Sequence, residues 1–236
     1  MRATLDARAE AVATLRRRAA ADHCEMTVVA QHIDAVADVP DLHYPVVRPS
    51  ELADVYAMRE DGGVLEHHRS VDVFSALRLP GEMSFAGGVF VVVRTGDAAT
   101  WEILRAKGHI VSRSGAYACI AWPYHLMGVE TPLTIAAAVD PATPQPRPTQ
   151  HVVLAGRANR PLAAGTELRV HGHHHEIDGV DPVVLTAGDA SAAPFYLAGG
   201  GRLRRDVGTG QTITFDDLEG IDEGAAALFR AGVDRT

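Results

Sequence analysis

The residues best suited to chemistry are grouped in Ala121–Pro132, where a tyrosine, a histidine and a glutamate follow an apolar run. Prolines in this stretch restrict the backbone and hold the polar side chains on a stiffened loop. A histidine exchanges protons near neutral pH, and a phenol can donate a hydrogen bond to a developing enolate. We therefore expect Tyr124, His125 and Glu130 to be catalytic, with His125 or Glu130 as the general base. The alternative is that Tyr124 and His125 are half-buried residues at a domain seam.

A second polar group, Arg59-Glu60-Asp61, leads into the glycine pair Gly62-Gly63. Arg59 is suited to anchor an anionic group of a substrate, and Glu60 or Asp61 to orient it. Glycines at this point let the backbone adopt positive φ or approach a ligand closely. We expect the three polar residues to bind substrate, although a solvated turn explains the segment equally well.

Three more residues are expected to bind substrate, namely His43, Tyr44 and Ser84. His43 and Tyr44 lie in a loop that prolines interrupt on both sides. They either face the same cavity as Tyr124 and His125 or are ordinary loop residues. Ser84 lies at the start of a run that leads into a β-branched strand.

A histidine-rich loop follows at residues 170–179 and contains His171, His173 and His175. Imidazole groups suit zinc or nickel, so this loop is a weak candidate for a metal site. Adjacent histidines in a surface loop often bind metal only adventitiously, and no well-spaced second group accompanies them. We expect no native metal site and no cofactor.

Helices and strands must position these residues, and their pattern predicts an α+β fold with a mixed sheet and helices. Apolar residues recur with a period near 3.6 over residues 2–33, which predicts one long helix with a possible break near Asp22-His23. Residues 83–93 end in a β-branched string typical of a buried strand, and residues 116–121 form the next strand. Residues 100–107 and 133–139 have helical character.

Residues 140–150 form a linker in which prolines recur, and such a segment is extended and stiff. We place a domain boundary there, with a catalytic-type α/β layer domain at residues 1–145 and a small all-β domain at residues 146–236. Short strands separated by glycine turns support the second assignment.

The composition of the 236-residue chain is that of an ordinary globular protein, with 47% hydrophobic and 22% charged residues. The net charge of -8 argues against nucleic-acid binding, which needs a basic face. No apolar run reaches the roughly 18 residues that a membrane span requires. The charged N-terminus is unlike a signal peptide, so we expect a cytoplasmic location and no membrane partner. Cys24 and Cys119 alone suggest neither a disulfide framework nor a cysteine metal site.

Residues 159–168 and 203–218 resemble the SAF module, a small β-clip domain. Four motifs also occur in the order found in SAF-containing oxidoreductases similar to homoserine dehydrogenase: Glu60–Gly63, Gly88–Val93, Pro123–Leu126 with Glu130–Pro132, and Ala198–Val207. That group includes reductoisomerase-like enzymes that convert deoxyxylulose phosphate to methylerythritol phosphate. The resemblance covers residues 24–218 and implies carbonyl substrates and a homodimer.

The sequence also departs from this family. Its members begin with a Rossmann domain that carries a glycine-rich dinucleotide loop, which has no counterpart before Cys24. Gly199-Gly200-Gly201 lies at the end of the expected β module and lacks the β-α-β context of a phosphate site. Met127 stands where the family has a cysteine, which argues against a thiol role.

Three functions remain open on this basis. The first is a non-redox isomerase, lyase or cyclase that acts on a small polar carbonyl metabolite by acid–base chemistry. The second is the substrate-domain subunit of an NAD(P)-dependent oxidoreductase whose Rossmann domain is on another chain. The third is a protein that binds a small metabolite or acts as a scaffold without turning anything over.

Overall fold

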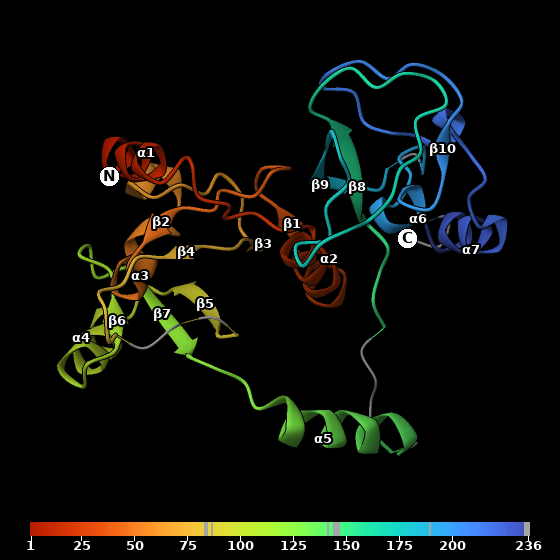
Figure 1. The fold of residues 1–236 in the computed structure, drawn as a ribbon. Helices are drawn as coiled ribbons and strands as arrows, with labels where there is room; N and C mark the ends of the chain where they lie inside the picture. The colour runs from red at the N-terminus through yellow and green to blue at the C-terminus, as the bar shows by residue number, and fades with distance from the viewer. Residues whose placement is uncertain (83–84, 86, 141, 144–146, 189, 234–236) are drawn as a thin grey trace. The chain divides into compact units, whose positions relative to one another are not determined.

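The computed structural model describes residues 1–82, 85, 87–140, 142–143, 147–188 and 190–233. The chain forms two compact units that are discontinuous in sequence. Unit 1 contains Met1–Arg16, Pro45–His68 and Phe74–Pro146, and unit 2 contains Arg17–Tyr44, Arg69–Val73 and Arg147–Thr236. Helices and small sheets mix in the fold, consistent with the expected α+β class (Figure 1).

Unit 1 contains an antiparallel sheet in the order β5-β7-β6 and a parallel pair of short strands, β2 and β4. Its strands are β2 (Val46–Val47), β4 (Ser75–Ala76), β5 (Val89–Arg94), β6 (Ile110–Val111) and β7 (Tyr117–Trp122). Its helices are α1 (Arg2–Ala11), η1 (Pro49–Glu51), α3 (Leu52–Val55), η2 (Arg59–Asp61), α4 (Ala98–Ala106) and α5 (Met127–Val139).

The expected strands and helices around the candidate catalytic residues are present, but the strand β5 is not buried as expected, because its side chains alternate between exposed and partly buried. The strand expected at residues 116–121 is β7, which pairs with β5 from Val89↔Trp122 to Arg94↔Tyr117. The helix expected at residues 100–107 is α4, and its N-cap is Asp97, whose side chain accepts the backbone N–H of Thr100. Tyr117 and Cys119 point from β7 into the core of unit 1, where Val47, Leu52 and Tyr56 are also buried.

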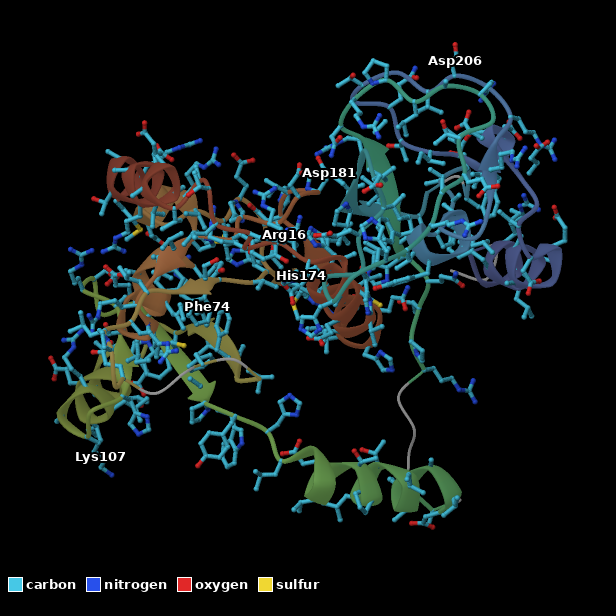
Figure 2. The ribbon with its side chains drawn as sticks, viewed as in Figure 1. Arg16, Phe74, Lys107, His174, Asp181 and Asp206 are labelled. Atoms are coloured by element: carbon cyan, nitrogen blue, oxygen red, sulfur yellow. The ribbon has the colours of Figure 1, made fainter. Side chains whose placement is uncertain are left out.

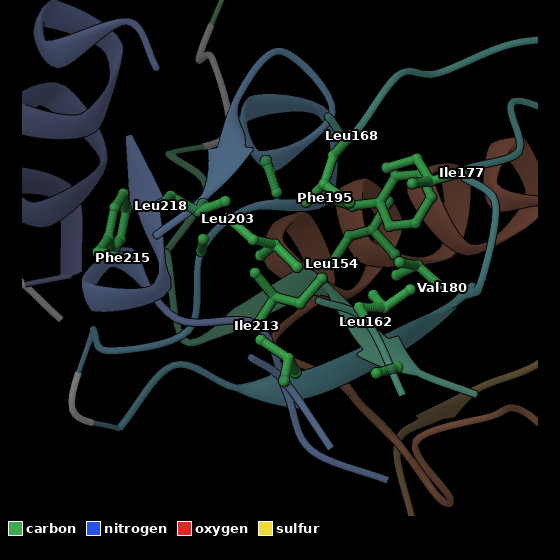
Figure 3. Packing of buried hydrophobic residues seen from close by; sticks show 14 of the residues in the cluster. Leu154, Leu162, Leu168, Ile177, Val180, Phe195, Leu203, Ile213, Phe215 and Leu218 are labelled. Carbon is green, nitrogen blue, oxygen red and sulfur yellow. The ribbon is translucent and has the colours of Figure 1, made fainter. Parts of the chain in front are cut away.

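Unit 2 is built around the antiparallel pair β8 (Val152–Ala158) and β9 (Val180–Thr186) and the helix α2 (Ala20–Ile33) that contacts both strands. The remaining elements are β1 (Val36–Ala37), β3 (Ser70–Val71), α6 (Phe195–Ala198), β10 (Arg202–Leu203), η3 (Phe215–Asp217), β11 (Leu218–Glu219) and α7 (Glu223–Val233). Figure 3 shows its main core, in which Leu154, Phe195 and Ile213 pack together. β1 and β3 pair in parallel, as Val36↔Ser70 and Ala37↔Val71.

The single helix expected at residues 2–33 is wrong, because the chain forms two helices that belong to different units. α1 ends at Ala11, and α2 begins at Ala20 after the extended residue Ala19. α1 is held in unit 1 by an ion pair between Arg8 and Glu51 at 2.7 Å, and this pair lowers the pKa of Glu51. α2 buries Ala20, Thr27 and Ala30 in unit 2. The apolar periodicity runs across both helices, so it does not show that α1 and α2 pack in different units.

Among the residues that the structure describes, no helix is both long enough and apolar enough to cross a bilayer. Both cysteines are free thiols. Burial raises the pKa of Cys119 to about 11, so its thiolate is scarce at neutral pH.

Candidate functional site

The structure brings two of the three predicted catalytic residues together at the start of α5. His125 Nδ1 lies 3.6 Å from Glu130 Oε2, and both side chains are accessible to solvent. The other carboxylate oxygen of Glu130 accepts the backbone N–H of Leu126 at 3.0 Å, which fixes the carboxylate relative to the helix. The backbone N–H of His125 donates to the carbonyl of Gly87 at 3.2 Å, which ties this loop to the residues before β5.

This arrangement is suited to proton transfer. A carboxylate beside one ring nitrogen can orient an imidazole so that its other nitrogen exchanges a proton with a bound molecule. Tyr124 precedes the histidine and is half exposed. The prediction that Tyr124, His125 and Glu130 act as a catalytic group stays a prediction, now with a defined distance between two of its members.

The predicted substrate-binding residues of η2 form a separate polar cluster. Asp61 accepts a hydrogen bond from the Tyr117 hydroxyl at 2.5 Å and lies 3.5 Å from Arg94. Arg94 also lies 3.9 Å from Glu60 and over the ring of Tyr117. Burial raises the pKa of Tyr117, and its hydrogen bond to Asp61 adds to this effect. Arg59 forms an ion pair with Glu66.

The two predicted groups lie toward opposite ends of β7. Asp61 contacts Tyr117, the first residue of this strand, whereas Tyr124 and His125 follow its last residue, Trp122. Five steps along a strand correspond to about 17 Å. Arg59, Glu60 and Asp61 therefore do not share one small pocket with the His125–Glu130 pair.

His43 is the centre of a third cluster, which lies in unit 2. Its ring Nδ1 lies 2.6 Å from Asp72 Oδ2, and its Nε2 lies 3.3 Å from Asp38 Oδ2. The side chain of Asp38 is fully buried, and that of Asp72 is 4% exposed. Asp38 directly follows β1 and Asp72 directly follows β3, so the carboxyl ends of two parallel strands supply the two carboxylates.

Tyr44 packs beside this cluster as a buried residue. Its hydroxyl donates to Asp22 at 3.0 Å, and its carbonyl accepts a hydrogen bond from Arg17 at 3.0 Å. Burial raises the pKa of Tyr44, and the negative charge of Asp22 raises it further. Leu42 and Tyr44 both have left-handed backbone conformations, which non-glycine residues adopt only where the surroundings impose them. His43 and Tyr44 are thus parts of a built cluster rather than ordinary loop residues.

The remaining candidates divide into two cases. Ser84 lies outside the described residues. In the histidine-rich loop, His171 pairs with Asp178 at 3.0 Å and His175 bonds to the Tyr196 hydroxyl at 2.9 Å. Over the part of the chain that is described, no three His, Cys, Asp or Glu side chains gather in a way that would hold a metal ion.

The site residues that sequence reasoning missed are Asp38, Asp72 and Tyr117. Asp72 contacts His43 across 29 positions and Tyr117 contacts Asp61 across 56 positions, whereas Asp38 lies 3.3 Å from the nearby residue His43. The one local signal was the position of each aspartate directly after a short stretch that contains a valine, Val36-Ala37 or Ser70-Val71, and this signal is weak on its own.

Unit 1 therefore carries an accessible pair, His125 and Glu130, and unit 2 carries a buried cluster of His43 with two aspartates. The family model described as "Oxidoreductase DRL, catalytic domain" matches residues 18–131. Comparison with curated proteins found no match. The matched range contains all the predicted catalytic and substrate-binding residues and ends directly after Glu130, whereas the histidine-rich loop lies outside it.

The oxidoreductase alternative drawn from the sequence would require a nicotinamide nucleotide. A dinucleotide site consists of a strand, a glycine-rich turn and a helix whose N-terminus meets the pyrophosphate. Within the described ranges, no strand leads through a turn with two or more glycines into an α-helix. Gly199-Gly200-Gly201 follows the short helix α6 and precedes β10, which is the opposite order. The described residues therefore do not fit the nucleotide.

Proposed function

We propose that the chain is an enzyme that acts on a small polar carbonyl metabolite by acid–base chemistry, as an isomerase, lyase or cyclase. The observation that carries this proposal is the accessible His125–Glu130 pair, with 3.6 Å between Nδ1 and Oε2. The family match supports only a catalytic role for this stretch, because the model of an oxidoreductase catalytic domain matches the residues that include this pair.

In the proposed reaction, Glu130 orients the imidazole of His125 through Nδ1. Nε2 of His125 then removes a proton from the carbon next to the substrate carbonyl, and the electron pair of that C–H bond moves to the carbonyl oxygen as an enolate. Tyr124 donates a hydrogen bond to the enolate oxygen. Return of the proton to a different atom completes an isomerisation without any net change of oxidation state.

A second candidate function is the substrate domain of an NAD(P)-dependent oxidoreductase whose Rossmann domain is on another chain. The oxidoreductase description of the matched family favours it. A third candidate, a metabolite-binding or scaffold protein, is favoured by the placement of Arg59 and His125 at opposite ends of β7.

The C-terminal part of unit 2 belongs to the same proposal as an SAF-like β-clip module. Short bridges such as Leu162↔Val207, Glu167↔Arg202 and Ala192↔Thr214 link loops rather than long strands, as expected for a small β module with many turns. We assign this module a supporting role.

The test is the thermal stability of the purified chain with NADH, NADPH and a panel of phosphorylated and carboxylated carbonyl metabolites. A ligand that binds only the native state raises the unfolding temperature by mass action. Stabilisation by a metabolite, followed by exchange of its carbon-bound protons in D₂O seen by NMR, would support the non-redox enzyme. Stabilisation by a nucleotide would favour the oxidoreductase, and metabolite binding without proton exchange would favour the binding protein.

A further inference from the structure

His23 is buried near the start of α2, with 1% of its surface exposed. Its ring Nδ1 lies 3.0 Å from the carbonyl oxygen of Ala19, four residues earlier. Because a carbonyl oxygen can only accept, Nδ1 carries the proton of the neutral ring and Nε2 is left as an acceptor. Nε2 is buried, and no group of the described residues forms a hydrogen bond with it. A proton added at Nε2 would therefore place a charge in a site that water does not reach.

His32 in the same helix makes the same contact at the surface. Its ring Nδ1 lies 2.8 Å from the carbonyl oxygen of Val28, also four residues earlier. The His32 side chain is exposed, so its charged form is hydrated. The two histidines differ in burial, which disfavours the charged ring at His23 alone.

The charged groups next to His23 do not compensate for its burial. Asp22 lies beside it in the helix and Arg18 precedes the helix, so the effects of these two charges oppose each other. The loop after β1 contributes the backbone carbonyl of Asp41 and the ring of Tyr44, whose centroid lies 5.5 Å from that of His23. Burial lowers the pKa of His23 and outweighs the nearby carbonyl groups and Asp22, which favour the charged ring.

The strands packed against α2 add little charge to this region. β8 and β9 each contain one charged residue, Arg157 and Asp181, and β1 and β3 contain none. Arg157 forms an ion pair with Asp41, and Asp181 accepts a hydrogen bond from Asn159. The carboxylates that the strands and the loop bring here are therefore already bound by other side chains.

The first turn of α2 holds two loops of unit 2. The backbone N–H of Ala20 donates at 3.0 Å to the carbonyl of His174, in the histidine-rich loop (Figure 2). The carboxylate of Asp22 accepts the hydroxyl of Tyr44, the neighbour of His43, at 3.0 Å. Opening of this turn would release both loops together.

We propose that His23 is an acid-sensitive switch in unit 2. Uptake of one proton at Nε2 gives an imidazolium, which becomes hydrated only when the first turn of α2 opens. The open turn loses its hydrogen bonds to His174 and Tyr44. The inference goes beyond the proposed function and does not depend on it.

The pH range of the switch follows from the direction of the pKa shift. In the open state the imidazole has its ordinary pKa near 6.5, whereas burial in the closed state lowers the pKa. The closed turn is therefore fully stable above about pH 6.5, and it weakens as the pH falls from there toward the folded-state pKa. Uptake of one proton changes the opening equilibrium by at most about tenfold per pH unit.

The first experiment measures hydrogen exchange of the full chain by mass spectrometry from about pH 7.5 to about pH 5, corrected for the intrinsic exchange rates. Protection of the amides at the start of α2 should fall by up to about tenfold per pH unit below about pH 6.5. α4, in unit 1, is the internal reference and should keep its protection. Constant protection of α2, or an equal fall in α2 and α4, would overturn the proposal.

The second experiment removes the titrating ring with His23→Leu, which is apolar, and with His23→Gln, which is polar. Both variants should keep the start of α2 protected down to about pH 5. His32→Gln is the matched control and should lose protection as the wild-type chain does. Circular dichroism at neutral pH checks that each variant folds. A wild-type loss in a folded His23 variant would overturn the proposal, and where neither variant folds, the wild-type comparison of α2 with α4 decides.

Discussion

The carboxylate of Asp72 contacts both the backbone N–H and the ring of His43. It accepts the backbone N–H of His43 at 3.1 Å and lies 2.6 Å from the ring Nδ1. It also accepts the backbone N–H groups of Tyr44 and Val73. One buried carboxylate at the end of β3 therefore fixes the path of the loop that contains His43 and Tyr44.

Replacing Asp72 by Asn should strongly destabilise unit 2. The amide oxygen still accepts backbone N–H groups, but the amide nitrogen cannot accept the hydrogen bonds that the second carboxylate oxygen accepts from His43. Leaving a buried hydrogen-bond donor without its acceptor costs about 1–3 kcal/mol. Denaturant unfolding followed by circular dichroism measures the change.

The matched control is Asp34→Asn, which removes the carboxylate of the exposed ion pair with Arg69. Asp34 has a left-handed backbone that asparagine also tolerates, so the substitution tests the charge alone. Exposed pairs contribute about 0–1 kcal/mol. Equal losses for Asp72→Asn and Asp34→Asn would show that the His43 cluster is not a special contributor to stability.

Glu130→Gln and Tyr124→Phe should each lower turnover of the substrate found by thermal shift by about 10²–10⁴-fold, the range for loss of a general acid–base group. Glutamine still accepts the Leu126 N–H, so the start of α5 is preserved while the charge next to His125 is lost. Proton exchange in D₂O is the measurement.

Glu102→Gln on the exposed side of α4 serves as the control for the loss of one carboxylate and should leave turnover unchanged. Unchanged turnover in both site variants, with an intact fold, would remove Glu130 and Tyr124 from the mechanism. The oxidoreductase alternative would then rest on other residues.

The strands and helices next to the site were predictable because their signals are local. The β-branched run that ends at Val93 forms β5, and the apolar run before Pro123 forms β7. The start of α5 was predicted too late, at Leu133. The helix begins at Met127, where the Glu130 side chain and backbone bonds to Leu126 close the first turn, and it continues through Pro132.

What the sequence could not reveal depends on packing between distant segments. The division of residues 2–33 into α1 and α2 follows from membership in different units, which periodicity does not record. His43 meets Asp72 across 29 positions, and Asp61 meets Tyr117 across 56. Such pairs become visible only once the strands that carry them are assembled.

Gly63→Ala should destabilise unit 1 more than Gly62→Ala. A Cβ at Gly63 would lie 1.9 Å from the carbonyl oxygen of Ala57, so the backbone itself would have to move. Gly63 therefore allows close approach of another backbone segment of the same chain, not of a ligand. Gly62 has a φ of +92° but open space around it, so alanine there should cost about 1–2 kcal/mol. For Gly63→Ala we expect about 3 kcal/mol or more, the upper end for overpacking. Denaturant midpoints compare the two variants, and a larger loss at Gly62 would contradict the proposed packing.

The stability of unit 2 should fall in acid partly through Asp217. Burial alone would raise the pKa of Asp217, but hydrogen bonds from Thr214 and from Arg205 outweigh burial and lower it. A carboxyl whose pKa is lower in the folded state stabilises the protein above its unfolded pKa, near 3.9, and loses this contribution as the pH falls through the folded pKa.

Asp217→Asn should therefore lower stability at pH 7 by about 1–3 kcal/mol and make the loss below about pH 5 shallower. The exposed neighbour Asp216→Asn is the control and should keep the steep acid loss. Unfolding free energies measured from pH 7 to pH 3 give both slopes, and equal slopes for wild type and Asp217→Asn would show that this carboxyl does not drive the acid transition.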